Sequence, residues 1–385
     1  MTEERPGQGP LDALTDVAGI RVGHARVPGE GALSGTTVVL APEGGAVAAV
    51  DVRGGGPGTR ETDALDPRNL VQRIDAVVLT GGSAYGLDAA SGVMAWLEER
   101  GRGVQVGPDP SQVVPVVPAA CLFDLGRGGS WRARPDASTG RAAVEAAAAS
   151  EPGAQVPEGT VGAGTGAVAG GLKGGVGTAG IRLASGITVA ALAVVNAAGS
   201  VLDPVTGVLY GEYGAGEPPA HPAPEVHEAA RRRLAEIQGA REAHAKRAGA
   251  PEDAARSGDS RAGIPEGDAQ TGGSRTGSVL NTTIAVVATD AVLTRAQAQK
   301  LAGTAHDGLA RAVRPVHLLT DGDTVFALST GRLPLPPEPV TALNGILAAG
   351  ADALARAIVK AVRAARGVDG PGGTFPSYGE LYGAP

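Results

Sequence analysis

Residues 281–293 read NTTIAVVATDAVL and form the most informative stretch of the chain. The interior of this run is too apolar for a strand with one face in water, so it suits the middle of a sheet buried on both faces. Just before it, residues 250–278 are polar and rich in Gly and Ser, and we expect that segment to be mobile. The abrupt change places the hydroxyl residue Thr282 at the start of a buried strand.

Working outward, strands and helices alternate on both sides of Thr282. Short β-branched runs bounded by Gly, Pro or Asp predict strands over 19–22, 36–40, 46–52, 76–79, 186–195 and 200–202, and DGDTVFALST predicts another. Apolar spacing and charged blocks predict helices over 84–100, 225–248, from Thr294 with a Thr294–Gln297 capping box, and over 340–364. This order predicts a layered α/β sandwich.

The composition limits which classes of protein the chain can belong to. A chain of 385 residues with 43% hydrophobic content can bury one large core or two modest ones, and its 61 glycines predict close backbone packing. With a formal net charge of −7 and dispersed Lys and Arg residues, we expect no nucleic-acid partner. The first thirty residues lack a secretory pattern, which predicts a cytoplasmic protein, and the apolar run 187–199 is too short to span a membrane.

Two glycine-rich motifs have ordinary structural explanations. GVGTAG at 175–180 fits a dinucleotide-binding pattern, but a predicted strand follows it where a helix is required. GGSAYG at 81–86 resembles a nucleophile elbow whose last glycine is displaced by one position. It follows a predicted strand and opens a helix, so N–H groups near Gly82 would suit an oxyanion, while Ser83 itself fits a structural helix start.

The histidines and the single cysteine indicate little chemistry of their own. No histidine pair has metal-ligand spacing on a regular element, so we expect no metal and no cofactor. His306 fits a half-buried structural residue, with a catalytic role as the alternative. Cys121 lies in the apolar run 118–125, which is typical of a buried and inert thiol, and one cysteine fits a reducing compartment.

The Asn281-Thr282-Thr283 stretch has two explanations. One is an ordinary strand start. In the other, the Thr282 hydroxyl attacks the carbonyl of Asn281, the amide becomes an ester, and hydrolysis releases an α-amine on Thr282. An unperturbed α-amine has a pKa of about 7.7–8.0 and can accept the hydroxyl proton near neutral pH, so nucleophile and base would lie on one residue.

Motifs over most of the chain resemble a known family. These are the N-terminal-nucleophile hydrolases that include L-aminopeptidase/D-amidase/esterase, the β-peptidyl aminopeptidases and the endo-type nylon-oligomer hydrolase. The matching motifs are VRGGGPGTRETD, LTGGSAYGLDAA, AGTGAVAGGLKGG, VVNAAG, DGDTVFAL and, most specific, NTTIAVVATDA. The resemblance implies an αββα sandwich of dimers or ring-like tetramers that hydrolyses small amides, short peptides or nylon-6 type oligomers.

The resemblance also implies where the chain is processed. Cleavage between Asn281 and Thr282 would give a larger fragment, residues 1–281, and a smaller fragment, residues 282–385. The larger fragment would carry a mobile connector at about residues 212–280. The smaller fragment would begin with the nucleophile.

The candidate site residues follow from the same motifs. Lys173 in GGLKGG, Asn196 in VVNAAG, and Asp321 and Asp323 in DGD match functional positions of relatives, and we predict that all four converge on Thr282. The alternative explanations are a turn lysine, a strand-end asparagine and an ordinary DGD turn. Phe123 stands where several relatives have a tyrosine, and it cannot donate that hydrogen bond. Another donor, such as Asn196 or an amide near Gly82, would then stabilise the oxyanion, or the substrate would be held differently, with Ser83 and Phe123 as contacts.

Two other functions compete with the hydrolase. Ornithine acetyltransferases also cleave themselves before a threonine and share a similar layered fold, but they pass the acyl group to an amine instead of water. The other alternative is a cleaved but catalytically silent structural or binding protein. Turnover of acyl-amino acids with and without an acceptor amine separates the first, and a covalent serine/threonine hydrolase probe separates the second.

Overall fold

The computed structural model describes residues 7–214, 216, 218–248 and 281–383, with only the backbone for 7–8 and 242–248. The predicted mobile segment 250–278 lies outside the described residues. The strands are β1 (Gly7–Gln8), β2 (Arg21–Arg26), β3 (Gly35–Leu40), β4 (Val47–Val52), β5 (Gly58–Arg60), β6 (Ala76–Thr80), β7 (Val104–Gln105), β8 (Val113–Val114), β9 (Ala119–Cys121), β10 (Val168–Ala169), β11 (Leu172–Lys173), β12 (Val176–Arg182), β13 (Thr188–Val194), β14 (Ile284–Ala291), β15 (Thr324–Leu333), β16 (Val368–Gly370) and β17 (Gly373–Phe375). The helices are α1 (Ser83–Gly86), α2 (Ala89–Glu98), α3 (Ala137–Ala149), α4 (Pro224–Ala248), α5 (Arg295–Ala312), α6 (Pro339–Ala364) and α7 (Tyr378–Tyr382).

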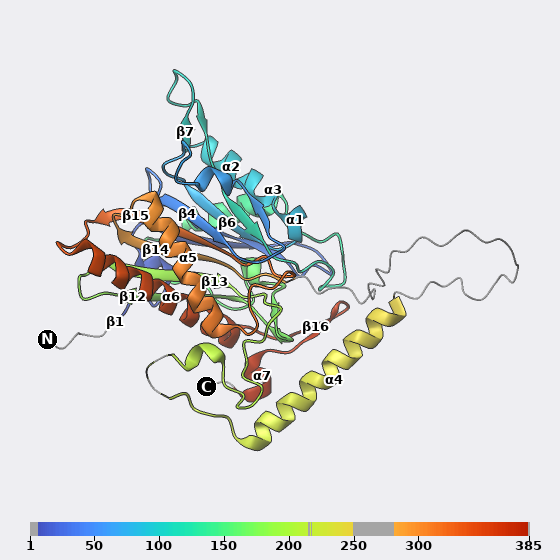
Figure 1. The fold of residues 1–385 in the computed structure, drawn as a ribbon. Helices are drawn as coiled ribbons and strands as arrows, with labels where there is room; N and C mark the ends of the chain where they lie inside the picture. The colour runs from blue at the N-terminus through green and yellow to red at the C-terminus, as the bar shows by residue number, and fades with distance from the viewer. Residues whose placement is uncertain (1–6, 215, 217, 249–280, 384–385) are drawn as a thin grey trace, which may run out of the picture.

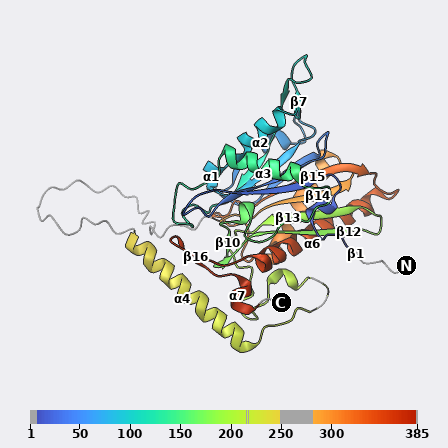
Figure 2. The same cartoon turned by 180° about the vertical axis from the view of Figure 1, so that it is seen from behind.

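Two large mixed sheets organise the described part of the chain. One has the order β1-β12-β13-β14-β15-β4, and the other has the order β2-β3-β6-β9-β5. Each contains one parallel pair, β14 with β15 and β6 with β9, among antiparallel neighbours. In both views of the ribbon, α2 and α3 cover one sheet and α5 and α6 cover the other (Figures 1 and 2). The predicted αββα layering is therefore confirmed.

The buried apolar side chains form three groups that match these layers. One lies between the two sheets, one between the six-stranded sheet and α5 and α6, and one between the five-stranded sheet and α2 and α3. Strand β14 contributes side chains to two of these groups. Ile284 and Val286 face the core between the sheets, and Ala285 and Val287 face the helices. This alternation explains why the strand is apolar at almost every position.

The helices on the six-stranded sheet agree with the predicted ones. Thr294 caps α5, and the reciprocal contacts of the capping box with Gln297 are present. Helix α6 is long and apolar enough to cross a membrane by length and hydropathy, but 56% of that window is buried inside the protein. It packs against α5, β12 and β13, as expected of a core helix. Helix α4 contacts α7 and projects away from the sandwich (Figure 1).

Two predicted elements are wrong. The predicted helix 84–100 is divided into α1 and α2, because the amides of Leu87 and Asp88 bond to carbonyls three residues back instead of four. The predicted strand 200–202 forms only isolated bridges. There the Ser200 hydroxyl bonds to the Leu202 carbonyl and amide at 2.8 and 3.0 Å, a local pattern that competes with a sheet ladder.

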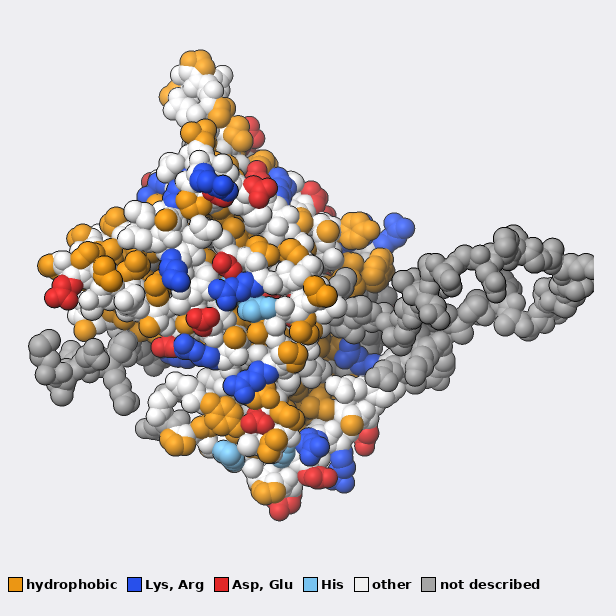
Figure 3. Space-filling model, viewed as in Figure 1, with side chains coloured by type: hydrophobic (Ala, Val, Ile, Leu, Met, Phe, Trp, Pro, Cys, Tyr) orange, Lys and Arg blue, Asp and Glu red, His pale blue; other side chains and the backbone are white. Residues whose placement is uncertain are grey.

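The surface carries both signs of charge. On the face shown in Figure 3, basic and acidic side chains are interspersed among apolar and neutral ones, without one large basic area. Such a distribution gives no electrostatic attraction for a polyanion on this face.

Candidate active site

Thr282 lies where three segments meet, two residues before the start of β14. Its N–H donates to the carbonyl of Asn196, just after β13, at 2.6 Å. Its hydroxyl oxygen accepts the N–H of Gly322, just before β15, at 3.2 Å. The side chains around it are packed closely enough that Thr282 is only 5% exposed. The sheet thus holds the candidate nucleophile between the ends of its two neighbouring strands.

The Thr282 hydroxyl lies against the Asn281–Thr282 peptide bond. That hydroxyl is hydrogen-bonded to the Asn281 carbonyl oxygen. The Gly322 N–H also donates to this carbonyl oxygen, at 3.2 Å. A single backbone amide therefore contacts both the attacking oxygen and the oxygen that would gain negative charge, which is the arrangement of an oxyanion donor.

Gly322 has no room for a side chain. A Cβ there would lie 2.9 Å from the Thr282 hydroxyl oxygen and 2.9 Å from the Gly56 carbonyl oxygen. The loop that carries Gly56 also fixes the position of the DGD segment, because the Gly56 N–H donates to the Asp321 carbonyl at 2.7 Å. The absence of a side chain is thus what lets the amide approach the hydroxyl.

Asp321 and Asp323 lie on either side of this amide and organise the backbone. Asp323 accepts the N–H of Thr283 at 2.7 Å, and its other oxygen accepts the backbone N–H of His317 and contacts His317 Nδ1 at 2.8 Å. Asp321 accepts the N–H of Ala198 at 3.3 Å. Burial and the neighbouring Asp323 charge raise the pKa of Asp321. Asp323 thus bonds to the residue after Thr282, and Asp321 bonds to the segment that follows β13, so both support the site one contact away.

Asn196 and Arg127 form the opposite wall of the site. Asn196 accepts the N–H of Val168 at 3.0 Å through its side-chain oxygen, which also accepts from Arg127, and its amide nitrogen donates to the Phe123 carbonyl at 3.3 Å. Arg127 donates through Nη2 to the side-chain oxygen of Asn281 at 2.9 Å. Burial lowers the pKa of Arg127 to about 10, so the guanidinium stays charged at neutral pH.

Lys173 is fully buried behind this wall. Its Nζ donates to the carbonyl oxygens of Gly164, Ala167 and Gly174 at 2.9, 2.9 and 2.7 Å. Desolvation lowers its pKa well below the ordinary value, with the positive charge of Arg127 acting in the same direction. The turn that it ties together also supplies Gly166, whose carbonyl accepts from Arg127 at 2.7 Å. Lys173 therefore contacts the backbone that holds Arg127, and the three hydrogen bonds of its Nζ go to that turn and not to Thr282.

The three remaining candidates have other partners. The Gly82 N–H donates to Asp124 at 2.7 Å, and the Ser83 N–H donates to the Leu122 carbonyl at 2.9 Å. An oxyanion role for either amide would require breaking that hydrogen bond. The Phe123 ring packs edge-on against Trp131, with 6.1 Å between the ring centroids. Because the Asn196 amide is also engaged, the Gly322 N–H is the donor that the structure brings to Thr282.

Sequence reasoning missed Arg127, His317 and Gly322. Arg127 lies between glycines in LGRGG, four residues after Phe123, and a cation in a glycine-flanked turn was the available signal. Gly322 lies inside the DGD motif, where only the acids drew attention. His317 packs edge-on against His306 at 4.8 Å between centroids and bonds to Asp323.

The residues given a structural explanation have buried positions. His306 is fully buried rather than half-buried, and desolvation lowers its pKa to about 4. Burial raises the pKa of the Cys121 thiol to about 12, which leaves it unreactive as a thiolate at neutral pH. Two of the three GVGTAG glycines, Gly177 and Gly180, lie in β12. Among the residues that the structure describes, His, Cys, Asp and Glu side chains form no group of three suited to a metal ion.

Two facing mixed sheets between helical layers, with a buried threonine entering the central strand, define the N-terminal-nucleophile hydrolase fold. The chain belongs to peptidase family S58, whose model matches residues 12–375. An uncharacterized aminopeptidase of Mycobacterium tuberculosis is 45% identical over 392 residues, covering 97% of this chain and 98% of the relative. A 6-aminohexanoate-oligomer endohydrolase of Kocuria sp. is 30% identical over 346 residues, covering 88% of this chain and 80% of the relative.

Solved structures show the same fold. A β-aminopeptidase of Burkholderia sp. has a TM-score of 0.66 at 22% identity, with 99% of this chain and 94% of that chain covered. The L-aminopeptidase D-Ala-esterase/amidase of Ochrobactrum anthropi, described as a variant of the Ntn hydrolase fold, has a TM-score of 0.66 at 21% identity. The coverage there is 97% of this chain and 96% of that chain.

Proposed function

We propose that the protein is a self-processing amide hydrolase, with Thr282 as the nucleophile both for its own cleavage and for substrate turnover. The observation that carries this proposal is the Gly322 amide. It donates at 3.2 Å to the Thr282 hydroxyl oxygen and at 3.2 Å to the Asn281 carbonyl oxygen. Attack and charge stabilisation would then take place without movement of the strand ends.

Self-processing begins with the Thr282 hydroxyl adding to the Asn281 carbonyl carbon. The Gly322 N–H stabilises the resulting oxyanion, the C–N bond breaks, and the nitrogen takes the proton lost by the hydroxyl. Water then hydrolyses the ester. Asn281 ends as a carboxylate, and Thr282 gains an α-amine whose nitrogen already lies 2.6 Å from the Asn196 carbonyl.

Substrate turnover repeats this chemistry with the new amine as the base. The amine takes the hydroxyl proton as Thr282 attacks a substrate amide, and it returns the proton to the departing amine. Water hydrolyses the acyl-enzyme to a carboxylic acid. Because Thr282 is 5% exposed in the uncut arrangement, withdrawal of Asn281 is what would open the site to a substrate.

The other candidate site residues hold the backbone and side chains around Thr282 in place. Asp323 fixes the Thr283 amide and His317, and Asp321 fixes the Ala198 amide, so the two acids hold both flanks of Thr282. Asn196 holds the Thr282 nitrogen and, through its side chain, Arg127. Lys173 holds the turn beneath Arg127. Preorganised backbone of this kind lowers the cost of stabilising charge in the transition state.

The substrate class is amides with a short acyl group, either the N-terminal residue of a peptide or a unit of a linear aminoalkanoate oligomer. Relatives named as an aminopeptidase and a 6-aminohexanoate-oligomer endohydrolase support the two possibilities. We further propose a cytoplasmic homodimer or homotetramer of cleaved protomers.

A panel of aminoacyl p-nitroanilides, β-peptides and nylon-6 oligomers tests the substrate class. We expect release of the amine with water as the acyl acceptor from at least one of them. An acyl-amino acid assayed with and without glutamate provides the matched comparison. Acetyl transfer to glutamate, with no turnover of the panel, would instead support the acyltransferase.

A further inference from the structure

Asn281, the residue before the candidate nucleophile, has a hydrogen-bond partner for its N–H, its carbonyl oxygen and its side-chain oxygen. The Asn281 N–H donates to the Thr320 carbonyl at 3.2 Å, and the Asn281 carbonyl oxygen accepts from Gly322 at 3.2 Å. The side-chain oxygen of Asn281 accepts from Arg127 Nη2 at 2.9 Å. Asn281 is only 7% exposed, so these partners enclose it.

Arg127 is a costly residue to bury without a partner. It is 9% exposed, and its Nη1 is already committed to Gly166 and Asn196. Its Nη2 has the Asn281 side chain as its acceptor. When Asn281 withdraws after cleavage, that N–H loses its acceptor in a site where an unpaired charged donor is unfavourable.

The charges around Arg127 favour an acceptor that carries negative charge. Arg127 and Arg241 are both basic and act on each other electrostatically, and one acid, Asp124, opposes them. A guanidinium also binds a carboxylate more strongly than a neutral carbonyl, because the hydrogen bond is charge-assisted.

We propose that Arg127 is the side-chain ligand of an acyl subsite for an N-terminal aspartyl or asparaginyl residue. This inference rests on the proposed function, since it takes Asn281 as the first residue that Thr282 attacks. In the matured protein the substrate's α-ammonium replaces the Asn281 N–H at the Thr320 carbonyl. The scissile carbonyl oxygen meets the Gly322 N–H, and the side-chain oxygen meets Arg127 Nη2.

The subsite predicts a particular order of substrates. Leucine has nearly the shape of asparagine and aspartate but cannot accept a hydrogen bond, so it would leave the guanidinium unpaired. Alanine is too short to reach it. Because a hydrogen bond to a charged group contributes enough to matter, we expect kcat/KM for aspartyl and asparaginyl p-nitroanilides to exceed that for the leucyl compound by about tenfold or more.

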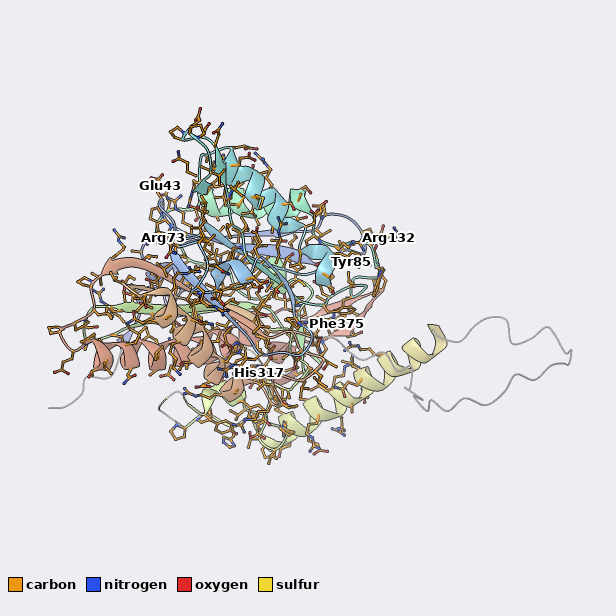
Figure 4. The ribbon with its side chains drawn as sticks, turned by 45° about the horizontal axis from the view of Figure 1, so that its top comes forward. Glu43, Arg73, Tyr85, Arg132, His317 and Phe375 are labelled. Carbon is orange, nitrogen blue, oxygen red and sulfur yellow. The ribbon has the colours of Figure 1, made fainter. Side chains whose placement is uncertain are left out.

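Substitution of Arg127 tests the assignment. Arg127→Lys keeps the charge but loses the planar pair of donors, and we expect it to lower the ratio of kcat/KM for the aspartyl compound to kcat/KM for the leucyl compound to near one. Arg132→Lys is the matched control, because Arg132 is exposed and lies at the edge of the molecule (Figure 4). It should keep the full preference. Retention of the preference in matured Arg127→Lys would overturn the proposal.

A binding measurement covers the case in which Arg127→Lys fails to mature. Thermal unfolding of the wild-type protein, with cleavage checked by intact mass, is followed with L-aspartate, L-asparagine or L-leucine added. We expect the first two to raise the melting temperature and L-leucine to do so less, and equal effects would overturn the subsite. If the cleaved protein hydrolysed none of the p-nitroanilides yet bound L-aspartate selectively, the proposed function would fail and the subsite would stand.

Discussion

The two walls of the Asn281–Thr282 bond are built in different ways. One wall is local: residues 317–323 supply His317, Asp321, Gly322 and Asp323 from a single turn before β15. The other wall is assembled from Arg127, Asn196 and Lys173, which come from well-separated parts of the chain. The local wall contacts the two oxygen atoms that would react, through the Gly322 N–H. In the assembled wall, the Asn196 carbonyl accepts the Thr282 N–H, and Arg127 contacts the side chain of the residue that would be released. Recognition of the released side chain thus falls to the assembled wall alone.

The largest expected effect comes from removing the attacking oxygen on the local wall. Thr282→Ala should abolish both self-cleavage and amide hydrolysis, because no hydroxyl remains to form the ester. Thr282→Ser keeps the oxygen and should mature at least slowly. Electrophoresis of the purified variants reports cleavage, and a chromogenic amide assay reports activity.

Thr283→Val is the matched control for that experiment. The Thr283 hydroxyl is adjacent and buried but has no hydrogen-bond partner among the described residues. Valine has nearly the same shape, so we expect cleavage and turnover close to those of the wild-type protein. If Thr283→Val were inactive and Thr282→Ala active, the nucleophile would be Thr283 and the assignment of Thr282 would be wrong.

The next largest effect is expected at the oxyanion donor. Gly322→Ala places a methyl group against the Thr282 hydroxyl oxygen, at 2.9 Å before any relaxation, and displaces the amide. Loss of one oxyanion donor typically slows catalysis by about 10²–10³-fold, so we expect self-cleavage to slow by at least about 10²-fold. A time course of the two fragments after expression measures this.

Gly345→Ala provides the control for a glycine-to-alanine change. Gly345 lies in α6, and a Cβ there would meet nothing within 4 Å. It should leave cleavage unchanged and stabilise the helix slightly. Wild-type cleavage kinetics in Gly322→Ala would remove that amide from the mechanism.

Buried titratable groups beside the two walls should also change the stability of the protein with pH in opposite directions. Burial raises the pKa of Asp124, beside Arg127, to about 6, so its contribution to stability is present below its unfolded pKa and is lost as the pH rises through 6. Burial lowers the pKa of His306, against His317, to about 4. The contribution of His306 is present above about 6.5 and is lost as the pH falls through 4.

Urea unfolding between pH 4 and 6.5 measures this contrast, on a Thr282→Ala background so that the chain remains in one piece. The stability difference between the parent and Asp124→Asn should fall as the pH rises, by on the order of 3 kcal/mol. The difference between the parent and His306→Asn should fall by a similar amount as the pH decreases. If the two stability differences changed in the same direction with pH, the predicted contrast would be wrong.

Features set by short-range patterns could be predicted from the sequence. The apolar run of β14 and the Thr294–Gln297 capping box each depend on neighbouring residues, and both are present. The strand predicted over 200–202 failed because the Ser200 hydroxyl satisfies the local backbone, which hydropathy does not reveal. Arg127 could not be assigned, because its contact with Asn281 joins residues 154 apart along the chain.

Intact-mass spectrometry of the purified wild-type protein tests the central claim most directly. We predict two polypeptides, one ending at Asn281 and a 104-residue chain, from 385 minus 281, that begins with Thr282. The same sample should hydrolyse amides. A single uncut chain of 385 residues that still hydrolysed amides would contradict the account, because an internal Thr282 has no α-amine to act as its base.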